Sequence, residues 1–82
     1  MTRVTARQRQ VLLLAAGGNT NAAIAARLGI TSGTVNELLG TAYRRLGARD
    51  RTHAVALAIW CGDISLADLA TIAQPTSQER AA

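Results

Sequence analysis

The 82-residue chain has no lysine and no phenylalanine, and it holds one cysteine, one histidine and one proline. The single cysteine, Cys61, cannot form an internal disulfide, and with His53 it supplies too few ligands for a structural zinc site. An eighteen-residue apolar run and a secretory leader are both missing, so neither a membrane span nor secretion is expected. Aromatic side chains are limited to Tyr43 and Trp60, so the core must consist of leucine, isoleucine, valine and alanine, which favours closely packed helices.

Sheets and catalytic sites are also poorly supported. No run alternates apolar and polar residues for long enough to indicate a sheet, which argues against a β-barrel and a βαβ nucleotide fold. His53, Cys61 and the few carboxylates form no nucleophile–base pair and no metal-ligand spacing. The sequence therefore predicts one small domain that is not an enzyme and has no metal and no cofactor.

The basic charge is uneven along the chain, and all of it comes from arginine. Residues 1–51 carry eight arginines against Glu37 and Asp50, a net charge of +6, whereas residues 52–82 carry one arginine against three carboxylates, a net charge of −2. A basic half is compatible with a plain solvated surface. It also suits a polyanionic partner.

Cap residues and glycines divide the chain into five predicted helices. Thr5 and Gln8 form a capping box for the first, and the glycine pair at 17–18 ends it. Asn19 and Thr20 are both candidate caps for the second helix, and Thr31 and Asp50 cap the third and the fourth. Ser65 with Asp68 makes a capping pair for the last. The predicted helices cover residues 5–16, 20–28, 31–46, 51–61 and 65–73.

The second and third predicted helices are joined very tightly. In the second helix Ala23, Ile24, Arg27 and Leu28 share one face at helical spacing. Only Ile30 separates the glycine that ends this helix from the cap of the next. Two helices connected in this way must cross at a large angle, which is the signature of a helix-turn-helix.

The third predicted helix has two distinct faces. An inward stripe recurs at spacings of four, three and four residues and consists of Val35, Leu39, Ala42 and Leu46. The opposite face has no large apolar residue and consists of Gly33, Asn36, Glu37, Gly40, Thr41 and Arg44. That second face can lie against a wet or charged surface.

The fourth predicted helix has more apolar residues than one stripe needs. We expect one face to be made by Val55, Ala58 and Ile59, and a second, partly exposed face by His53, Ala56, Leu57 and Trp60. A partner is expected to cover the second face.

The fifth helix has a short apolar stripe that includes Leu66 and Leu69. We therefore expect a helix-turn-helix domain over residues 1–64, a helical extension over 65–74 and a flexible tail over 75–82.

These segments resemble the LuxR-type helix-turn-helix domain over about residues 3–64, in register and without gaps. The matching motifs are VTARQRQVL at 4–12, NAAIAARLGI at 21–30, TV at 34–35, YRRLGA at 43–48 and RTHAV at 51–55. The resemblance implies an all-α domain of four helices, to which the residues add the short fifth. It also implies a bacterial DNA-binding transcription regulator, here of the size of the free-standing, spore-regulator-like members and with no sensor attached.

The resemblance carries roles onto individual residues. The third helix, at about 32–46, enters the major groove of double-stranded DNA, with Asn36, Glu37 and Gly40 at base-contacting positions. Asparagine can pair with adenine, and glutamate can accept a hydrogen bond from cytosine. The implied phosphate contacts are Thr20, Asn21, Ser32, Thr34, Arg44, Arg45, Arg51 and Thr52. The alternative is that Thr20 and Thr31 are plain helix caps and that Asn36 and Glu37 belong to a solvated helix face.

The chain departs from the family pattern at three positions in this region. Asn36 stands where the family usually has lysine or arginine, Leu38 where it often has histidine, and Ala23 where it usually has a glutamate paired with a basic residue. Glu37 adds a negative charge on the face expected to meet DNA. This carboxylate repels phosphate unless it lies on a cytosine.

Family members dimerise through the fourth helix, which implies a symmetric contact by Ala56, Leu57 and Trp60. The alternative is that Trp60 packs against Leu66 and Leu69 of its own chain. A dimer places two recognition helices about one DNA turn apart, on the order of 34 Å, and predicts an inverted-repeat operator.

Three functions follow from these observations. The first is a sequence-specific, dimeric transcription regulator of bacterial or phage type, acting in the cytoplasm at the nucleoid. The second is a protein-interaction module with a degenerate recognition face that binds an RNA polymerase subunit, a sigma factor or a larger regulator. The third is a detached promoter-reading domain of a sigma factor, which shares the helix-turn-helix.

Overall fold

The computed structural model describes residues 3–72, so the tail predicted at 75–82 and the end of the extension lie outside the described residues. Within that range the chain forms helices and turns but no strand, which confirms the all-α class. None of the helices formed there is long and apolar enough to cross a membrane. The helices are α1 (Ala6–Ala16), α2 (Asn21–Leu28), α3 (Ser32–Leu46), α4 (Arg51–Cys61) and α5 (Leu66–Ile72).

The predicted caps start the helices. Thr5 Oγ1 accepts a hydrogen bond from the Gln8 N–H at 3.1 Å, while Gln8 Oε1 accepts one from the Thr5 N–H at 3.0 Å, so the capping box is present. Thr20, Thr31 and Asp50 each accept from the amide three residues on, at the starts of α2, α3 and α4. These bonds satisfy amides that have no partner within the helix.

Left-handed glycines end three of the helices. Gly29, Gly47 and Gly62 follow α2, α3 and α4 with φ angles of 71°, 74° and 87°. A side chain is strained in this region of backbone space, so glycine allows a sharp stop there. The helix boundaries therefore agree with the sequence prediction to within about one residue.

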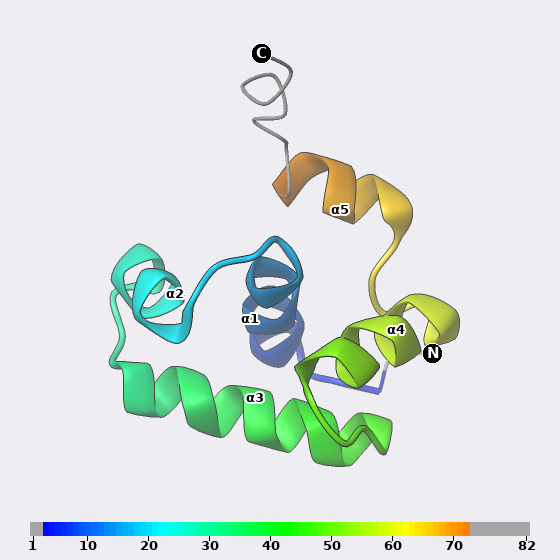
Figure 1. The fold of residues 1–82 in the computed structure, drawn as a ribbon, viewed down its shortest axis with the longest axis horizontal. Helices are drawn as coiled ribbons and strands as arrows, with labels where there is room; N and C mark the ends of the chain where they lie inside the picture. The colour runs from blue at the N-terminus through cyan, green and yellow to red at the C-terminus, as the bar shows by residue number, and fades with distance from the viewer. Residues whose placement is uncertain (1–2, 73–82) are drawn as a thin grey trace.

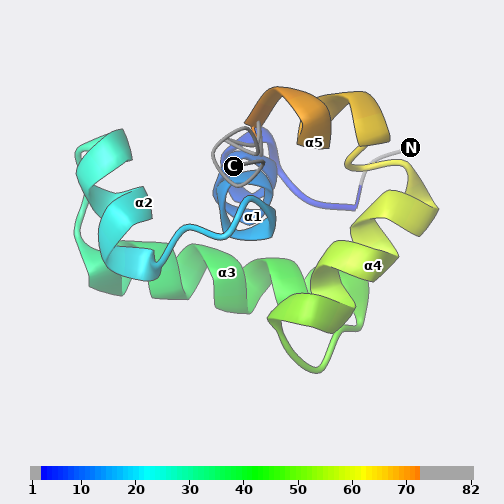
Figure 2. The ribbon, with the colours of Figure 1, turned by 45° about the horizontal axis from the view of Figure 1, so that its top comes forward.

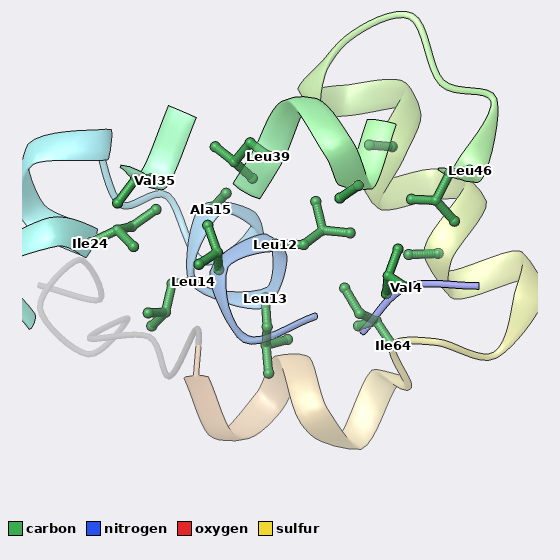
Figure 3. Close-up of a cluster of buried hydrophobic side chains, with 14 of the residues drawn as sticks. Val4, Leu12, Leu13, Leu14, Ala15, Ile24, Val35, Leu39, Leu46 and Ile64 are labelled. Carbon is green, nitrogen blue, oxygen red and sulfur yellow. The ribbon is translucent and has the colours of Figure 1, made fainter. Parts of the chain in front are cut away.

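The helices are arranged around α1, which lies across the middle of α3 (Figure 1). α2 packs against the first part of α3 and α4 packs near its end, so α3 forms one side of the molecule (Figures 1 and 2). The buried core gathered between them contains only aliphatic side chains (Figure 3). It consists of Val4, Val11, Leu12, Leu13, Leu14, Ala15, Ile24, Ala25, Val35, Leu39, Ala42, Leu46, Ala54, Ala58 and Ile64.

Two of the predicted apolar faces are partly wrong. In α2 the buried residues are Ile24 and Ala25, whereas Ala23 and Arg27 are exposed. The inward face of α2 is therefore rotated by about one residue from the predicted one. Leu28 remains on it, half-buried against the core.

In α4 the fully buried residues are Ala54 and Ala58, whereas Val55 and Ile59 are only half-buried. Ala54 was not placed on either predicted face. Two alanines one turn apart let the α4 backbone approach the core closely, because a methyl group takes up less space than a branched side chain. The larger residues then lie along the edges of the contact.

The segment before α1 is tied to the segment after α4 by contacts that the sequence analysis missed. The buried Asp63 carboxylate accepts two hydrogen bonds from the Arg3 N–H, at 3.0 and 3.2 Å. Arg9 Nε donates to the Asp63 carbonyl at 2.8 Å, and Arg9 Nη2 forms an ion pair with Asp68 Oδ2 at 2.6 Å. These bonds hold α5 beside α1, as Figure 2 shows.

The capping pair of α5 is confirmed, because the Ser65 N–H donates to Asp68 Oδ2 and the Asp68 N–H donates to Ser65 Oγ, both at 3.0 Å. The predicted stripe is only partly confirmed. Leu69 packs against the core, but Leu66 is 73% exposed. Leu66 is the first residue of α5 and is left in solvent.

The Asp68 carboxylate makes the docking of α5 dependent on pH. The pKa of Asp68 is lowered from its ordinary value, chiefly because the Ser65 backbone N–H donates to it, with the Ser65 hydroxyl and Arg9 adding to the effect. A carboxyl whose pKa is lower in the folded state stabilises the fold above its unfolded pKa, and this contribution is lost as pH falls through the folded pKa.

We therefore expect α5 to loosen as the pH falls below about 4, the ordinary range of an aspartate. Asp68→Asn, which keeps the shape and removes the charge, should lower amide protection in α5 already at pH 7 and leave α1 to α4 unchanged. Hydrogen exchange read residue by residue measures both. Equal protection of α5 in the two proteins at pH 7 would show that the ion pair does not hold this helix.

Candidate nucleic-acid interface

The helix-turn-helix presents one side of α3 to solvent. Val35, Leu39, Ala42 and Leu46 are buried as predicted, with Val35 and Ala42 at 0% exposure. Neither Figure 1 nor Figure 2 shows another described element on the side of α3 that points away from α1. We call this side the outer face of α3. It is formed by Gly33, Asn36, Glu37, Gly40, Thr41 and Arg44, of which Gly40 and Thr41 are half-buried and the others exposed.

The side chains of the outer face differ in how firmly they are held. The Thr41 hydroxyl donates to the Glu37 carbonyl at 3.0 Å and accepts from Arg44 Nη2 at 3.1 Å. Arg44 is therefore folded back along the helix. Among the hydrogen bonds of residues 3–72, none involves the side chain of Asn36 or Glu37. These two side chains are available to an external partner.

The start of α3 combines a neutral cap with exposed amides. Thr31 Oγ1 accepts from the Thr34 N–H at 3.1 Å and lies 3.0 Å from the Thr34 hydroxyl. Ser32 is exposed, and the first turn of α3 has no acidic residue. The positive end of the helix dipole is therefore not neutralised by the chain itself.

The structure joins two residues that the sequence analysis treated separately. Arg51, at the start of α4, donates through Nη2 to Asn21 Oδ1 at 2.6 Å and through Nη1 to the Asn19 carbonyl at 3.2 Å. Because the Asn21 amide uses its oxygen for Arg51, its NH₂ group points away from the guanidinium. Thr20 caps the same helix end through the Ala23 N–H at 3.1 Å.

This arrangement concentrates positive charge at the start of α2. The guanidinium of Arg51 lies at the positive end of the α2 dipole, and the first turn of α2 has no acidic residue. A cation at this end of a helix is electrostatically unfavourable until an anion lies nearby. Ala23, in the same turn, is exposed and carries no charge.

The other predicted phosphate contacts are exposed at the ends of helices. Arg44 and Arg45 lie in the last turn of α3, where a cation also stabilises the negative end of the helix dipole. Thr52 is exposed in the first turn of α4. The structure thus brings Asn21 and Arg51 together, with Thr52 next to Arg51 in the chain, and leaves Arg45 apart at the end of α3.

The predicted contact surface on α4 is divided. Trp60 is 82% exposed, so the alternative in which Leu66 and Leu69 of the same chain cover it is wrong. Ala56 is exposed as well, but Leu57 is half-buried and packs against the core. Trp60 lies in the last turn of α4, and α5 begins at Leu66.

A surface groove that the sequence analysis missed runs between the end of α1 and α4. Its volume is about 400 Å³, and it is mainly apolar. Val55 and Ile59 line it on one side and pack against the core on the other, which fits their half-burial. The lining residues are Ala15, Ala16, Arg51, Thr52, Val55, Ala56 and Ile59.

The helix-turn-helix geometry agrees with a comparison of the sequence with known families. The family model GerE, described as "Bacterial regulatory proteins, luxR family", matches residues 2–58. The chain belongs to the LuxR family of bacterial regulatory proteins. The match includes α1, α2, α3 and most of α4, so the outer face of α3 lies entirely within the LuxR-type domain.

Curated relatives with this domain are named as regulators of transcription. The chain is 52% identical over 58 residues to transcriptional activator protein BjaR1 of Bradyrhizobium diazoefficiens, which covers 71% of the chain and 24% of that protein. It is 48% identical over 54 residues to the probable transcriptional regulatory protein SgaR of Hyphomicrobium methylovorum, 66% of the chain and 26% of SgaR. It is 44% identical over 54 residues to response regulator RamR of Streptomyces coelicolor, 66% of the chain and 27% of RamR. The chain therefore spans about a quarter of the length of these relatives.

The contact between Arg51 and Asn21 can be measured by a double-mutant cycle. We expect Arg51→Ala and Asn21→Ala to be coupled by about 1 kcal/mol in urea unfolding, the range of a charge-assisted hydrogen bond that is partly exposed to water. Arg45→Ala removes the same charge from an exposed position and should change stability by less than about 0.5 kcal/mol. Additive effects of the two single variants would show that this contact does not join α4 to α2.

Proposed function

We propose that this LuxR-type chain is a sequence-specific DNA-binding regulator of transcription that inserts α3 into the major groove. The exposed, polar outer face of α3 carries this proposal, because its opposite face is buried and holds the helix in place. B-DNA has a major groove about 12 Å wide, which admits one α-helix. The names of the relatives support the same function.

Asn36 and Glu37, both exposed on the outer face, are the residues proposed to read bases. An asparagine amide can donate to and accept from one adenine, and a glutamate carboxylate can accept from the amino group of cytosine. Both side chains are free of hydrogen bonds within the described chain. Glu37 also repels phosphate, so positions of α3 along the groove in which Glu37 does not lie against a base are disfavoured.

Phosphate contacts are proposed at the starts of α2 and α3. Each start has a neutral threonine cap and no acidic residue, so exposed amides and the helix dipole favour an anion. At α2 the guanidinium of Arg51 and the outward NH₂ of Asn21 add to this field. The proposed phosphate contacts are Thr20, Asn21, Ser32, Thr34, Arg44, Arg45, Arg51 and Thr52.

The exposed part of α4 supports a symmetric dimer. Trp60 is a large apolar side chain left in water, and the apolar groove beside Ala56 lies on the same helix. A two-fold contact that covers Ala56, Leu57 and Trp60 removes this surface from water in both copies. Two copies then bind an inverted repeat with half-sites about one turn apart.

A second candidate function is binding of another protein, such as an RNA polymerase subunit, a sigma factor or a larger regulator. The observation that favours it is the pair of exposed apolar side chains, Trp60 at 82% and Leu66 at 73%. They lie at the end of α4 and the start of α5, away from the first half of α3 (Figure 1). This surface can be used alone or together with DNA binding.

Selection of binding sites from random duplexes by the purified protein tests the proposal. We expect an inverted repeat and an affinity that falls steeply with salt, because phosphate binding releases counterions. Asn36→Ala should lower discrimination at one base pair by about 1–3 kcal/mol. Arg44→Ala should weaken binding to all sequences alike and reduce the salt slope by about one.

Arg7→Ala is the matched control for charge, because Arg7 is exposed on α1 and belongs neither to α3 nor to the starts of α2 and α4. It should leave the selected sequence and the salt slope nearly unchanged. A protein that retains no duplex at low salt would contradict the proposed function. A selected site without two-fold symmetry would contradict the dimer and leave DNA binding in place.

A further inference from the structure

Two glycines of α3, Gly33 and Gly40, are not required by the fold of the chain. The glycines with positive φ are Gly18, Gly29, Gly47 and Gly62, and neither glycine of the outer face is among them. A Cβ built at Gly33 would come no closer than 3.8 Å to Thr31 Oγ1, and one at Gly40 no closer than 3.8 Å to Arg44 Nη1. Both are ordinary van der Waals contacts, so alanine fits at either position.

Both glycines weaken the helix that contains them. Glycine loses more backbone freedom on folding than any other residue, and it is less favourable than alanine inside a helix. Two such residues in α3 therefore lower stability without a benefit that the chain itself supplies. The need for an absent side chain then comes from something that α3 contacts outside the described chain.

The placement of the two glycines indicates what that contact is. They are seven residues apart, which is two helical turns and about 10 Å along the axis, and both lie on the outer face. Asn36 and Glu37 lie between them. The glycines thus bracket the two side chains that are free to read bases.

The reach of Asn36 makes close approach necessary. An asparagine side chain is short, so its amide reaches a base edge only if the helix backbone lies deep in the groove. A helix with its side chains is 10–12 Å across, about the width of the groove, so each methyl group on the contacting side limits depth.

We propose that Gly33 and Gly40 are specificity-determining positions at which α3 lies in backbone contact with DNA. Their missing side chains let the helix seat deeply enough for Asn36 and Glu37 to reach the bases. This inference rests on the proposed DNA-binding function. It adds that the glycines lower stability in exchange for recognition.

The test compares Gly40→Ala and Gly33→Ala with the natural chain in thermal unfolding and in binding to the selected duplex. We expect Gly40→Ala to raise the melting temperature by roughly 4 °C, and Gly33→Ala by less because it lies in the first turn. Each should weaken binding to the selected site by about tenfold or more, the effect of one lost base contact. Binding to a random duplex at low salt should change much less.

Gly47→Ala is the matched control, because Gly47 has a φ of 74° and lies beyond the outer face at the end of α3. It should lower the melting temperature and leave affinity nearly unchanged at a temperature where the variant is folded. Alanine at position 33 or 40 is thus expected to raise stability and weaken binding, whereas alanine at position 47 is expected to lower stability alone.

Each other outcome has one meaning. Alanine variants that melt higher but bind the selected duplex as tightly as the natural chain would overturn the inference and leave the proposed function standing. Variants that melt lower would show that the chain itself needs these glycines, which also overturns it. A natural chain that binds no duplex would overturn the proposed function and the inference together, and the natural chain alone reveals this case.

Discussion

Burial of one stripe of α3 against α1, α2 and α4 is the constraint on which the rest of the structure depends. Val35, Leu39 and Leu46 each gain about 1.5–3 kcal/mol when buried, and Ala42 allows close contact between the helices. Rotating α3 by half a turn would expose these side chains and bury Asn36 and Glu37 without partners. A domain of this size has a total stability of only about 5–15 kcal/mol, so that rotation unfolds it. The polar outer face therefore points to solvent because the apolar face cannot.

The neighbouring helices turn this exposed face into a surface that suits a polyanion. Gly29 and Ile30 allow α2 to turn sharply into α3. The starts of α2 and α3 are then two separate places on the molecule where an anion is favoured. Arg51 then ties the start of α4 to the start of α2 by its bonds to Asn21 and Asn19. One arginine thus supplies both charge and position. Glu37 is the opposing element, because its carboxylate repels phosphate.

The sequence predicted the helix boundaries and the faces of α3 because both depend on local chemistry. Threonine and aspartate cap amides within one turn of the chain, and glycine allows the left-handed backbone that ends a helix. In the fifteen residues of α3 the apolar side chains recur every three or four positions, so the apolar and polar faces are distinct. The rotations of α2 and α4 were less well predicted, since alanine fills much of both helices and gives little contrast between faces. Ala54 and Ala25 are buried although nothing in their neighbours distinguishes them from exposed alanines.

Contacts between distant parts of the chain could not be predicted in this way. Arg3 and Asp63 are sixty residues apart, and Arg51 and Asn21 are thirty apart, so no local period links them. The groove between α1 and α4 has the same origin, because it depends on how two helices pack rather than on either sequence. The sequence therefore indicated the residues of the candidate site singly, and the fold added which of them touch. The roles in DNA binding of the residues named from the family resemblance remain proposals.

Nuclear magnetic resonance of the isotopically labelled protein, titrated with its selected duplex, measures most directly whether the outer face of α3 meets DNA. The largest shifts are expected at the Asn36 side-chain amide and at the backbone amides of Ser32 and Gly40, with α5 unchanged. Shifts confined to α4 and α5, with the amides of the outer face unmoved at saturation, would contradict insertion of α3 into the groove.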